Sequence, residues 1–159
     1  MKRLIIIFIF FCLNLTYSQW DFRLNQSEKK LSAIGLFKFN RSEYDTISLN
    51  ISKSRKLGID LAIEGGFFNT SDHYFVLFEI DDRKIKVISS LKEKGKLRIL
   101  KLKDLKSKQQ FEILDFFNVL KRGSECILTV SSGFKVIQGF NTLIGSEDSI
   151  NRVLRGKYP

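Results

Sequence analysis

The sequence predicts a mainly β chain, either an antiparallel β-sandwich or a partly open barrel, of about eight or nine strands. Along most of the chain, apolar and polar residues alternate with a period of two, which is the pattern of strands that bury one face. The strand-like runs are short and are separated by turns, as in sandwiches and barrels. One stretch has apolar residues at helical spacing instead, so we expect one α-helix packed against the strands, and a short C-terminal helix after them.

The expected strands follow this alternation, which is clearest where Leu49 and Ile51 stand between polar Ser48 and Asn50. The strands are expected at residues 20–24, 31–39, 46–51, 57–63, 74–80, 84–89, 97–103, 125–131 and 134–138. The 74–80 run is apolar at both alternating positions. We therefore expect that strand to be buried on both faces, or to be covered by a helix.

The packed helix is expected over residues 107–122. Ser107 and Gln110 have the spacing of a capping box, in which each side chain satisfies a free backbone N–H of the first turn. A basic pair ends the segment, which suits the negative end of the helix dipole, and Gly123 suits the C′ position after it. Apolar residues at helical spacing would form the buried face: Phe111, Leu114, Phe117 (or Val119) and Leu120.

A second, shorter helix is expected to begin at Ser146. Glu147 and Asp148 would lie in its first turn, where carboxylates suit the positive end of the dipole. Three apolar residues at helical spacing would face inward: Ile150, Val153 and Leu154.

The first eighteen residues have the layout of a secretory signal peptide. Lys2 and Arg3 precede an uncharged apolar run at 4–13, and small residues follow at 16–18. The apolar run is about ten residues, whereas a membrane span needs roughly twenty. We therefore expect an exported chain, periplasmic or extracellular, in which residues 19–159 form a single β-sandwich domain without a transmembrane segment.

The positive charge is concentrated in one segment. Without the two basic signal residues, 25 Lys and Arg face 17 Asp and Glu, a formal net charge of +8. The segment 83–108 alone holds eleven basic residues and two acids. Such a face either keeps an edge strand from aggregating or serves as a docking strip for an anionic partner. On the second interpretation, the binding residues are Arg83, Lys84, Lys86, Lys92, Lys94, Lys96, Arg98, Lys101 and Lys103.

The expected partner is an anionic envelope lipid, an acidic glycan or an acidic protein surface. Nucleic acid is disfavoured because the chain is expected to be exported and the strip lacks interleaved aromatic residues for base stacking. Lys92, Lys94 and Lys96 are the favoured contacts, because a loop is expected at 91–96 and loop cations reorient at little cost.

Catalytic and metal sites are not expected, and no cofactor is predicted. His73 is the one histidine, and a solvated histidine at a strand end is the simplest interpretation. The Asp81-Asp82 pair is expected to be a turn rather than a calcium site. Asp60 and Glu64 are the acids that a carbohydrate-active hydrolase would use. The simpler interpretation is that Asp60 lies on a solvent face and Glu64 begins a loop.

Cysteines and two hydroxyl residues are the candidates for disulfide bonding, lipid attachment or glycosylation. Cys12 lies in the predicted signal peptide, and Phe10-Phe11 before it do not fit a lipobox, so Cys126 is the one cysteine after export. It is expected to be a buried core thiol, with pairing between chains as the alternative. Thr46 and Ser149 follow aspartates and precede isoleucines, which matches a pattern for O-glycosylation of exported bacterial proteins.

The second half of the chain resembles the periplasmic β-sandwich proteins of the invasion-associated locus B type. The features are a helix end at 117–124 (FNVLKRGS), the strand at 127–131 after it, and a closing segment at 134–143 (FKVIQGFNTL). The resemblance implies an exported sandwich with a binding or accessory role. It carries over no site residue. This chain has only Cys126 where that family often has paired cysteines.

The sequence thus favours an exported, non-enzymatic binding or accessory protein that holds an anionic partner with its basic strip. The rival hypothesis is a secreted inhibitor or immunity-type protein, whose basic face would cap the acidic surface of an effector. A carbohydrate-active hydrolase is the third hypothesis.

Overall fold

The computed structural model describes residues 19–39 and 47–157, so the predicted signal peptide, Cys12 and Thr46 lie outside the described part. The strands there are β1 (Trp20–Asn25), β2 (Lys30–Leu36), β3 (Lys38–Phe39), β4 (Ser48–Ser54), β5 (Gly58–Glu64), β6 (Phe75–Ile80), β7 (Arg83–Glu93), β8 (Lys96–Asp104), β9 (Gln110–Phe111), β10 (Glu125–Ser132) and β11 (Lys135–Thr142). The helices are α2 (Ile113–Arg122) and α3 (Ser146–Arg155). Neither has the length and apolar run needed to cross a membrane.

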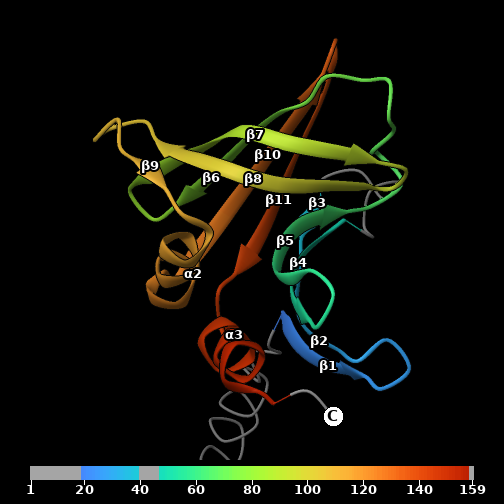
Figure 1. Ribbon diagram of the computed structural model, residues 1–159. Helices are drawn as coiled ribbons and strands as arrows, with labels where there is room; N and C mark the ends of the chain where they lie inside the picture. Colours follow the sequence, from blue (N-terminus) through green and yellow to red (C-terminus); the bar gives the residue numbers. More distant parts are fainter. Residues whose placement is uncertain (1–18, 40–46, 158–159) are drawn as a thin grey trace, which may run out of the picture.

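All the described strands belong to one antiparallel sheet, which is curled into a half-barrel (Figure 1). Its strand order is β1-β2-β4-β5-β8-β7-β6-β10-β11-β3, and β9 pairs with β8. The prediction of a mainly β fold with two helices is confirmed. The sheet has eleven strands rather than eight or nine, because two very short strands, β3 and β9, were not expected as separate elements.

Phe37 joins β2, which lies next to one end of the strand order, to β3 at the other end. Residues 31–39 were expected to form one strand, but the chain bends at this buried residue, so β2 pairs with β4 while β3 pairs with β11. A buried polar contact ties the same ends together. The indole Nε1 of Trp20 donates to Oδ1 of Asn141 at 2.8 Å, and Nδ2 of Asn141 donates to the carbonyl of Leu36 at 2.6 Å.

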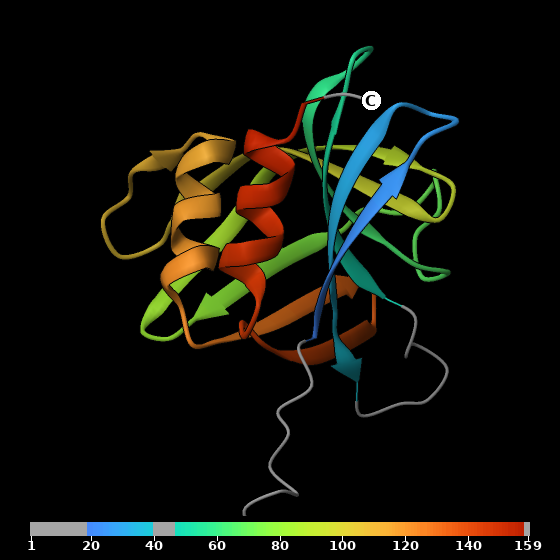
Figure 2. The ribbon, with the colours of Figure 1, turned by 90° about the horizontal axis from the view of Figure 1, so that it is seen from below.

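The two helices lie side by side over the inner face of the sheet (Figure 2). α3 packs against β1, β2 and β4, and α2 packs against α3, β8 and β9. Each helix buries an apolar face, and the Phe116 ring of α2 lies 5.0 Å from the Phe78 ring of β6. The core therefore sits between the helices and the curled sheet, which leaves the outer face of β6–β8, β10 and β11 toward solvent.

The start of α2 differs from the prediction. The helix begins at Ile113, not at Ser107, because Lys108 adopts a φ of 63° and the next residues form β9 against β8. The capping box is therefore not formed. The buried face of the helix also differs from the predicted one: Phe116, Phe117 and Leu120 are buried, whereas Leu114 is 52% exposed.

The end of α2 also differs. Gly123 has an extended backbone with φ −74°, not the left-handed conformation of a C′ glycine. It is required for a different reason, because an added Cβ would lie 2.6 Å from Cγ2 of Ile80 and 2.7 Å from Cδ1 of Leu143. α3 begins at Ser146 as predicted, with Ile150 and Val153 buried.

Candidate functional site

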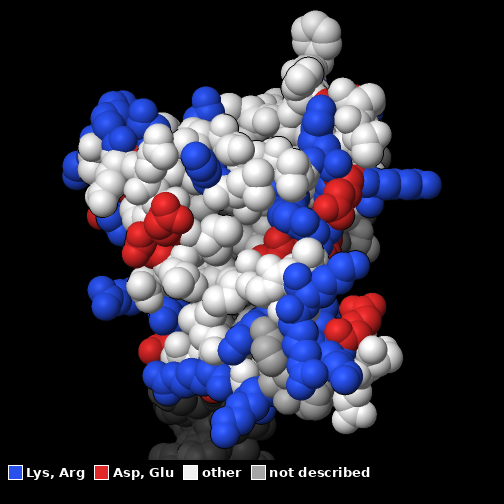
Figure 3. All heavy atoms as spheres, in the orientation of Figure 1, with Lys and Arg blue, Asp and Glu red and all other residues white. Residues whose placement is uncertain are grey.

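The nine predicted binding residues lie on β7, on β8 and in the turn between them. The expected loop at 91–96 is only the turn Lys94-Gly95, because β7 continues to Glu93 and β8 begins at Lys96. Lys92 and Lys96 are thus strand residues, not loop contacts. Lys and Arg also occupy several separate parts of the face shown in Figure 3, with Asp and Glu between them. The net charge alone therefore does not locate a docking surface.

Two of the nine residues are neutralised in an ion-pair cluster centred on Asp60 of β5. Nζ of Lys96 lies 3.4 Å from Oδ2 of Asp60 and 3.7 Å from Oε1 of Glu64. Nε of Arg98 lies 3.1 Å from Oδ1 of Asp60. Asp60 is 8% exposed, so the expectation that it stands on a solvated face was wrong. Glu64 is the last residue of β5 rather than part of a loop.

The cluster extends to both sides of this core. A terminal nitrogen of Arg98, Nη2, lies 3.3 Å from Oε1 of Glu93, and Nδ2 of Asn50 donates to Oε1 of Glu64 at 3.1 Å. It thus holds three carboxylates against two cations, which gives no excess positive charge. Lys96 and Arg98 therefore act as partners of the buried Asp60 and of two more exposed acids, and they are not free to hold an anionic partner.

A second group of cations lies on the outer face of the same strands. We call Lys86, Lys101 and Lys103 the outer lysine cluster. Lys86 of β7 stands directly opposite Lys103 of β8, and Lys101 is exposed two residues earlier on β8. None of the three has a carboxylate partner among the described residues. Like charges directly opposite on neighbouring strands repel each other, so this arrangement costs stability.

The remaining cations of β7 and its turn have weaker or exposed contacts. Nζ of Lys84 lies 3.0 Å from Oε2 of Glu79 in an exposed pair. Nζ of Lys92 donates to the backbone carbonyl of Asp72 at 2.9 Å. Lys94 is exposed at the turn. These residues add to the local field without forming a group of their own.

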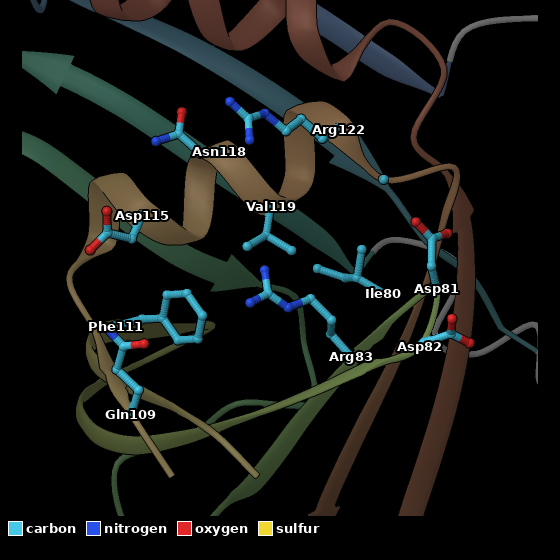
Figure 4. Close-up of a pocket in the computed structure, with 11 residues that line it drawn as sticks. Ile80, Asp81, Asp82, Arg83, Gln109, Phe111, Asp115, Asn118, Val119 and Arg122 are labelled. Carbon is cyan, nitrogen blue, oxygen red and sulfur yellow. The ribbon is translucent and has the colours of Figure 1, made fainter. Parts of the chain in front are cut away.

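Arg83 faces a cleft between α2, β9 and the turn that joins β6 to β7. The cleft has a volume of about 460 Å³ and an apolar floor that includes Ile80, Phe111 and Val119. Figure 4 shows the Arg83 side chain reaching into the middle of the cleft. The rest of the rim is largely polar: Asp81, Asp82, Gln109, Asp115, Asn118 and Arg122.

The position of Arg83 is held by two neighbours. Its Nε lies 3.5 Å from Oδ2 of Asp104, and its guanidinium carbon lies 5.5 Å from the centroid of the Phe111 ring. The backbone N–H groups of Ser107 and Lys106 donate to Asp104 at 2.9 and 2.8 Å. These hydrogen bonds, with the Arg83 charge, hold the pKa of Asp104 below its ordinary value. Asp104 therefore stays ionised and keeps Arg83 in place.

The cleft could not be found from the sequence, because its walls come from three separate segments. The turn Asp81-Asp82 was predicted, and it is a turn between β6 and β7. Asp81 has a structural role there, since its carboxylate accepts the backbone N–H groups of Ser124 at 3.1 Å and Glu125 at 3.3 Å. That contact ties the turn to the start of β10.

The loop before β6 packs its aromatic side chains together. Phe68 is buried at 2% exposure, and the centroid of its ring lies 5.8 Å from that of Phe67 and 5.1 Å from that of Tyr74. His73, within the same loop, is exposed. In residues 19–39 and 47–157, no three His, Cys, Asp or Glu side chains come together as a metal site would require.

Two of the residues proposed for covalent chemistry, Cys126 and Ser149, are buried. Cys126 of β10 is fully buried as a free thiol, as expected for the core, and burial raises the pKa of this thiol. A bond to a second chain would require local unfolding. Ser149 lies on the inner side of α3 at 5% exposure, so its hydroxyl is covered in the folded protein.

No family model, curated protein or solved structure is significantly similar to this chain. The segments that carry the resemblance given above correspond to the end of α2, to β10 and to β11. The interpretation of the site therefore rests on the chemistry of its own residues.

Proposed function

We propose that this protein is an exported, non-enzymatic binding or accessory protein that holds an anionic partner against its outer lysine cluster. The observation that carries the proposal is the direct opposition of Lys86 and Lys103 without a carboxylate between them. An anionic group placed over the pair would replace the repulsion with two attractions. Lys101, which is exposed beside them, extends the same positive field along β8.

The proposed binding surface is smaller than the strip of nine residues predicted from the sequence. Lys96 and Arg98 are left out because Asp60 lies within 3.4 Å of both side chains. Arg83 points into its cleft and is tied to Asp104. Lys92 and Lys94 also lack a carboxylate partner in the described part of the chain, but they lie in or next to the turn between β7 and β8. Lys86, Lys101 and Lys103 lie together on the outer face, so in this proposal the strip functions through three lysines rather than through nine residues.

The test neutralises the outer lysine cluster by changing all three lysines to Gln. Each lysine close to an anionic bilayer contributes about 1 kcal/mol, so binding to phosphatidylglycerol vesicles should weaken roughly a hundredfold at low salt. Binding to the soluble polyanion heparin should weaken in the same direction, and its dependence on salt should flatten. A control variant changes Lys29, Lys56 and Lys157, three exposed lysines on other parts of the surface, to Gln. Equal losses in both variants would show that only the net charge matters.

The cleft favours a second candidate, the secreted inhibitor or immunity-type protein. Unlike Arg98, whose side chain is 22% exposed, Arg83 is 52% exposed, so a guanidinium held at 3.5 Å from Asp104 above an apolar floor can still take one acidic side chain of a protein partner. Arg83→Gln would then abolish capture of a stoichiometric protein from envelope extract while leaving heparin binding unchanged. Capture that survives this substitution would count against the candidate.

A further inference from the structure

The hairpin between β10 and β11 presents an aromatic residue to solvent at its tip. Phe134 is fully exposed and follows Gly133, whose φ of 56° belongs to the turn. The hairpin projects beyond the ends of the neighbouring strands (Figure 1). A phenyl ring in water lacks the stabilisation that burial would give it. Its exposure at a projecting tip therefore indicates a binding partner that covers the ring.

More apolar side chains continue from the tip along the outer face. The register places Val136 of β11 opposite Ser131 of β10, and Ser131 opposite Phe75 of β6. Val136 is 58% exposed and Phe75 is 41% exposed. Of the two alternatives for the 74–80 strand, burial on both faces was therefore wrong, whereas cover by a helix is found on its inner face, where Phe78 packs against Phe116 of α2. We call Phe134, Val136 and Phe75 the apolar tip.

Cations adjoin the apolar tip. Nζ of Lys86 lies 4.9 Å from the centroid of the Phe75 ring, which joins the tip directly to the outer lysine cluster. Lys135 is exposed beside Phe134. The carboxylate of Asp72 lies close to these cations. Its pKa is lowered, first by a hydrogen bond from the Asn69 side chain and in smaller part by the charge of Lys135. With the outer lysine cluster included, the local charge remains positive.

We infer that the anionic partner is a lipid bilayer, and that the hairpin tip docks on it with Phe134 inserted among the headgroups and the outer lysine cluster facing anionic lipids. This inference rests on the proposed function and names its partner. The shape favours a bilayer over a protein, because a projecting ring needs a matching pocket on a protein but can enter a deformable lipid interface anywhere. Apolar side chains next to lysines are also the composition that interfacial membrane binders use.

The first experiment measures the depth of position 134. Phe134→Trp keeps an aromatic side chain, and the one native tryptophan, Trp20, is 4% exposed and therefore shielded from lipid. Vesicles of equal parts phosphatidylglycerol and phosphatidylcholine with brominated chains should quench the new tryptophan. The control is Leu57→Trp, a position 54% exposed in the turn between β4 and β5, at the other end of the molecule. Equal quenching in both variants, or none at position 134, would overturn the inference.

The second experiment separates the tip from the lysines. Phe134→Ser should weaken binding to the same vesicles about tenfold, since it removes one interfacial ring, and should leave heparin binding unchanged. Circular dichroism should show an unaltered fold, because the ring makes no contact. If the wild type binds heparin but not the vesicles, or if Phe134→Ser binds vesicles as well as the wild type, the bilayer inference fails and the proposed function stands. If the wild type binds neither, both fail.

Discussion

Replacing Asp60 by Asn tests the ion-pair cluster that removes Lys96 and Arg98 from the proposed binding surface. The substitution keeps the shape of the side chain and removes its charge, so Lys96 and Arg98 lose a shared partner within 3.4 Å. The side chain of Asp60 is 10% exposed, and those of Lys96 and Arg98 are 19% and 22% exposed. Water can therefore replace the lost carboxylate only in part.

The expected cost follows from this burial. Removal of one member of a buried ion pair typically costs about 3–5 kcal/mol, because the remaining charge is left uncompensated. Lys96 keeps Glu64 at 3.7 Å, and Arg98 keeps Glu93 at 3.3 Å, so each cation retains one acid. We therefore expect the lower end, about 3 kcal/mol, and a fall in Tm of roughly 10 °C for a domain of this size.

Urea denaturation followed by circular dichroism measures this cost. The control is Glu79→Gln, which removes the acid of the pair with Lys84, whose side chain is 61% exposed, and should cost less than about 1 kcal/mol. In a double-mutant cycle, Asp60→Asn and Arg98→Gln should show a coupling free energy above about 1 kcal/mol. A loss of under 1 kcal/mol for Asp60→Asn, equal to that of the control, would refute the buried cluster. It would also return Lys96 and Arg98 to the candidate binding residues.

Three further predictions concern stability. Phe117→Ala should cost about 3–5 kcal/mol in urea denaturation because Phe117 is fully buried, whereas Leu114→Ala on the same helix should cost under about 1 kcal/mol. Gly123→Ala should cost about 1–3 kcal/mol through its clash with β6, whereas Gly66→Ala, which has open space, should be nearly neutral. The pKa of Asp104 is lower in the folded than in the unfolded protein, so the stability that its carboxylate contributes is complete above about pH 4 and is lost as the pH falls through the folded pKa. Asp104→Asn lacks this contribution. Its free energy of unfolding should therefore fall less than that of the wild type between about pH 6 and pH 3. Parallel losses in the two proteins would contradict this.

The strands could be predicted because their signal is local. In β4, residues that alternate in polarity lie on opposite faces of the sheet, although both sets are buried there. The bend at Phe37 and the late start of α2 could not be predicted in the same way. Each depends on the pairing of a very short strand, β3 with the distant β11 and β9 with β8, the strand just before it. A two-residue strand has no periodicity of its own, so no local pattern could reveal it.

The candidate site was predictable in composition but not in arrangement. The excess of lysine and arginine on β7 and β8 is visible in the sequence, but the pairing of Lys86 with Lys103 is set by the cross-strand register. The burial of Asp60 depends on the pairing of β5 with β8. That pairing consists of only three residue pairs. Phe134 looked like the first residue of a strand, and its full exposure follows from the turn at Gly133.

Charges that are contiguous in the sequence thus enter different environments in the fold. Arg98 joins a cluster in which acids outnumber cations, Arg83 is fixed to one carboxylate above an apolar cleft, and Lys86 stands unpaired opposite Lys103. Because an ion pair screens its members from further partners, the lysines without a carboxylate dominate the local field. Those same lysines adjoin the exposed ring of Phe75, and the row through Phe75 leads to the hairpin tip. Electrostatic attraction and apolar insertion would therefore act from one face of the molecule. None of the described helices could cross a bilayer, so lasting attachment would need both of these interactions together.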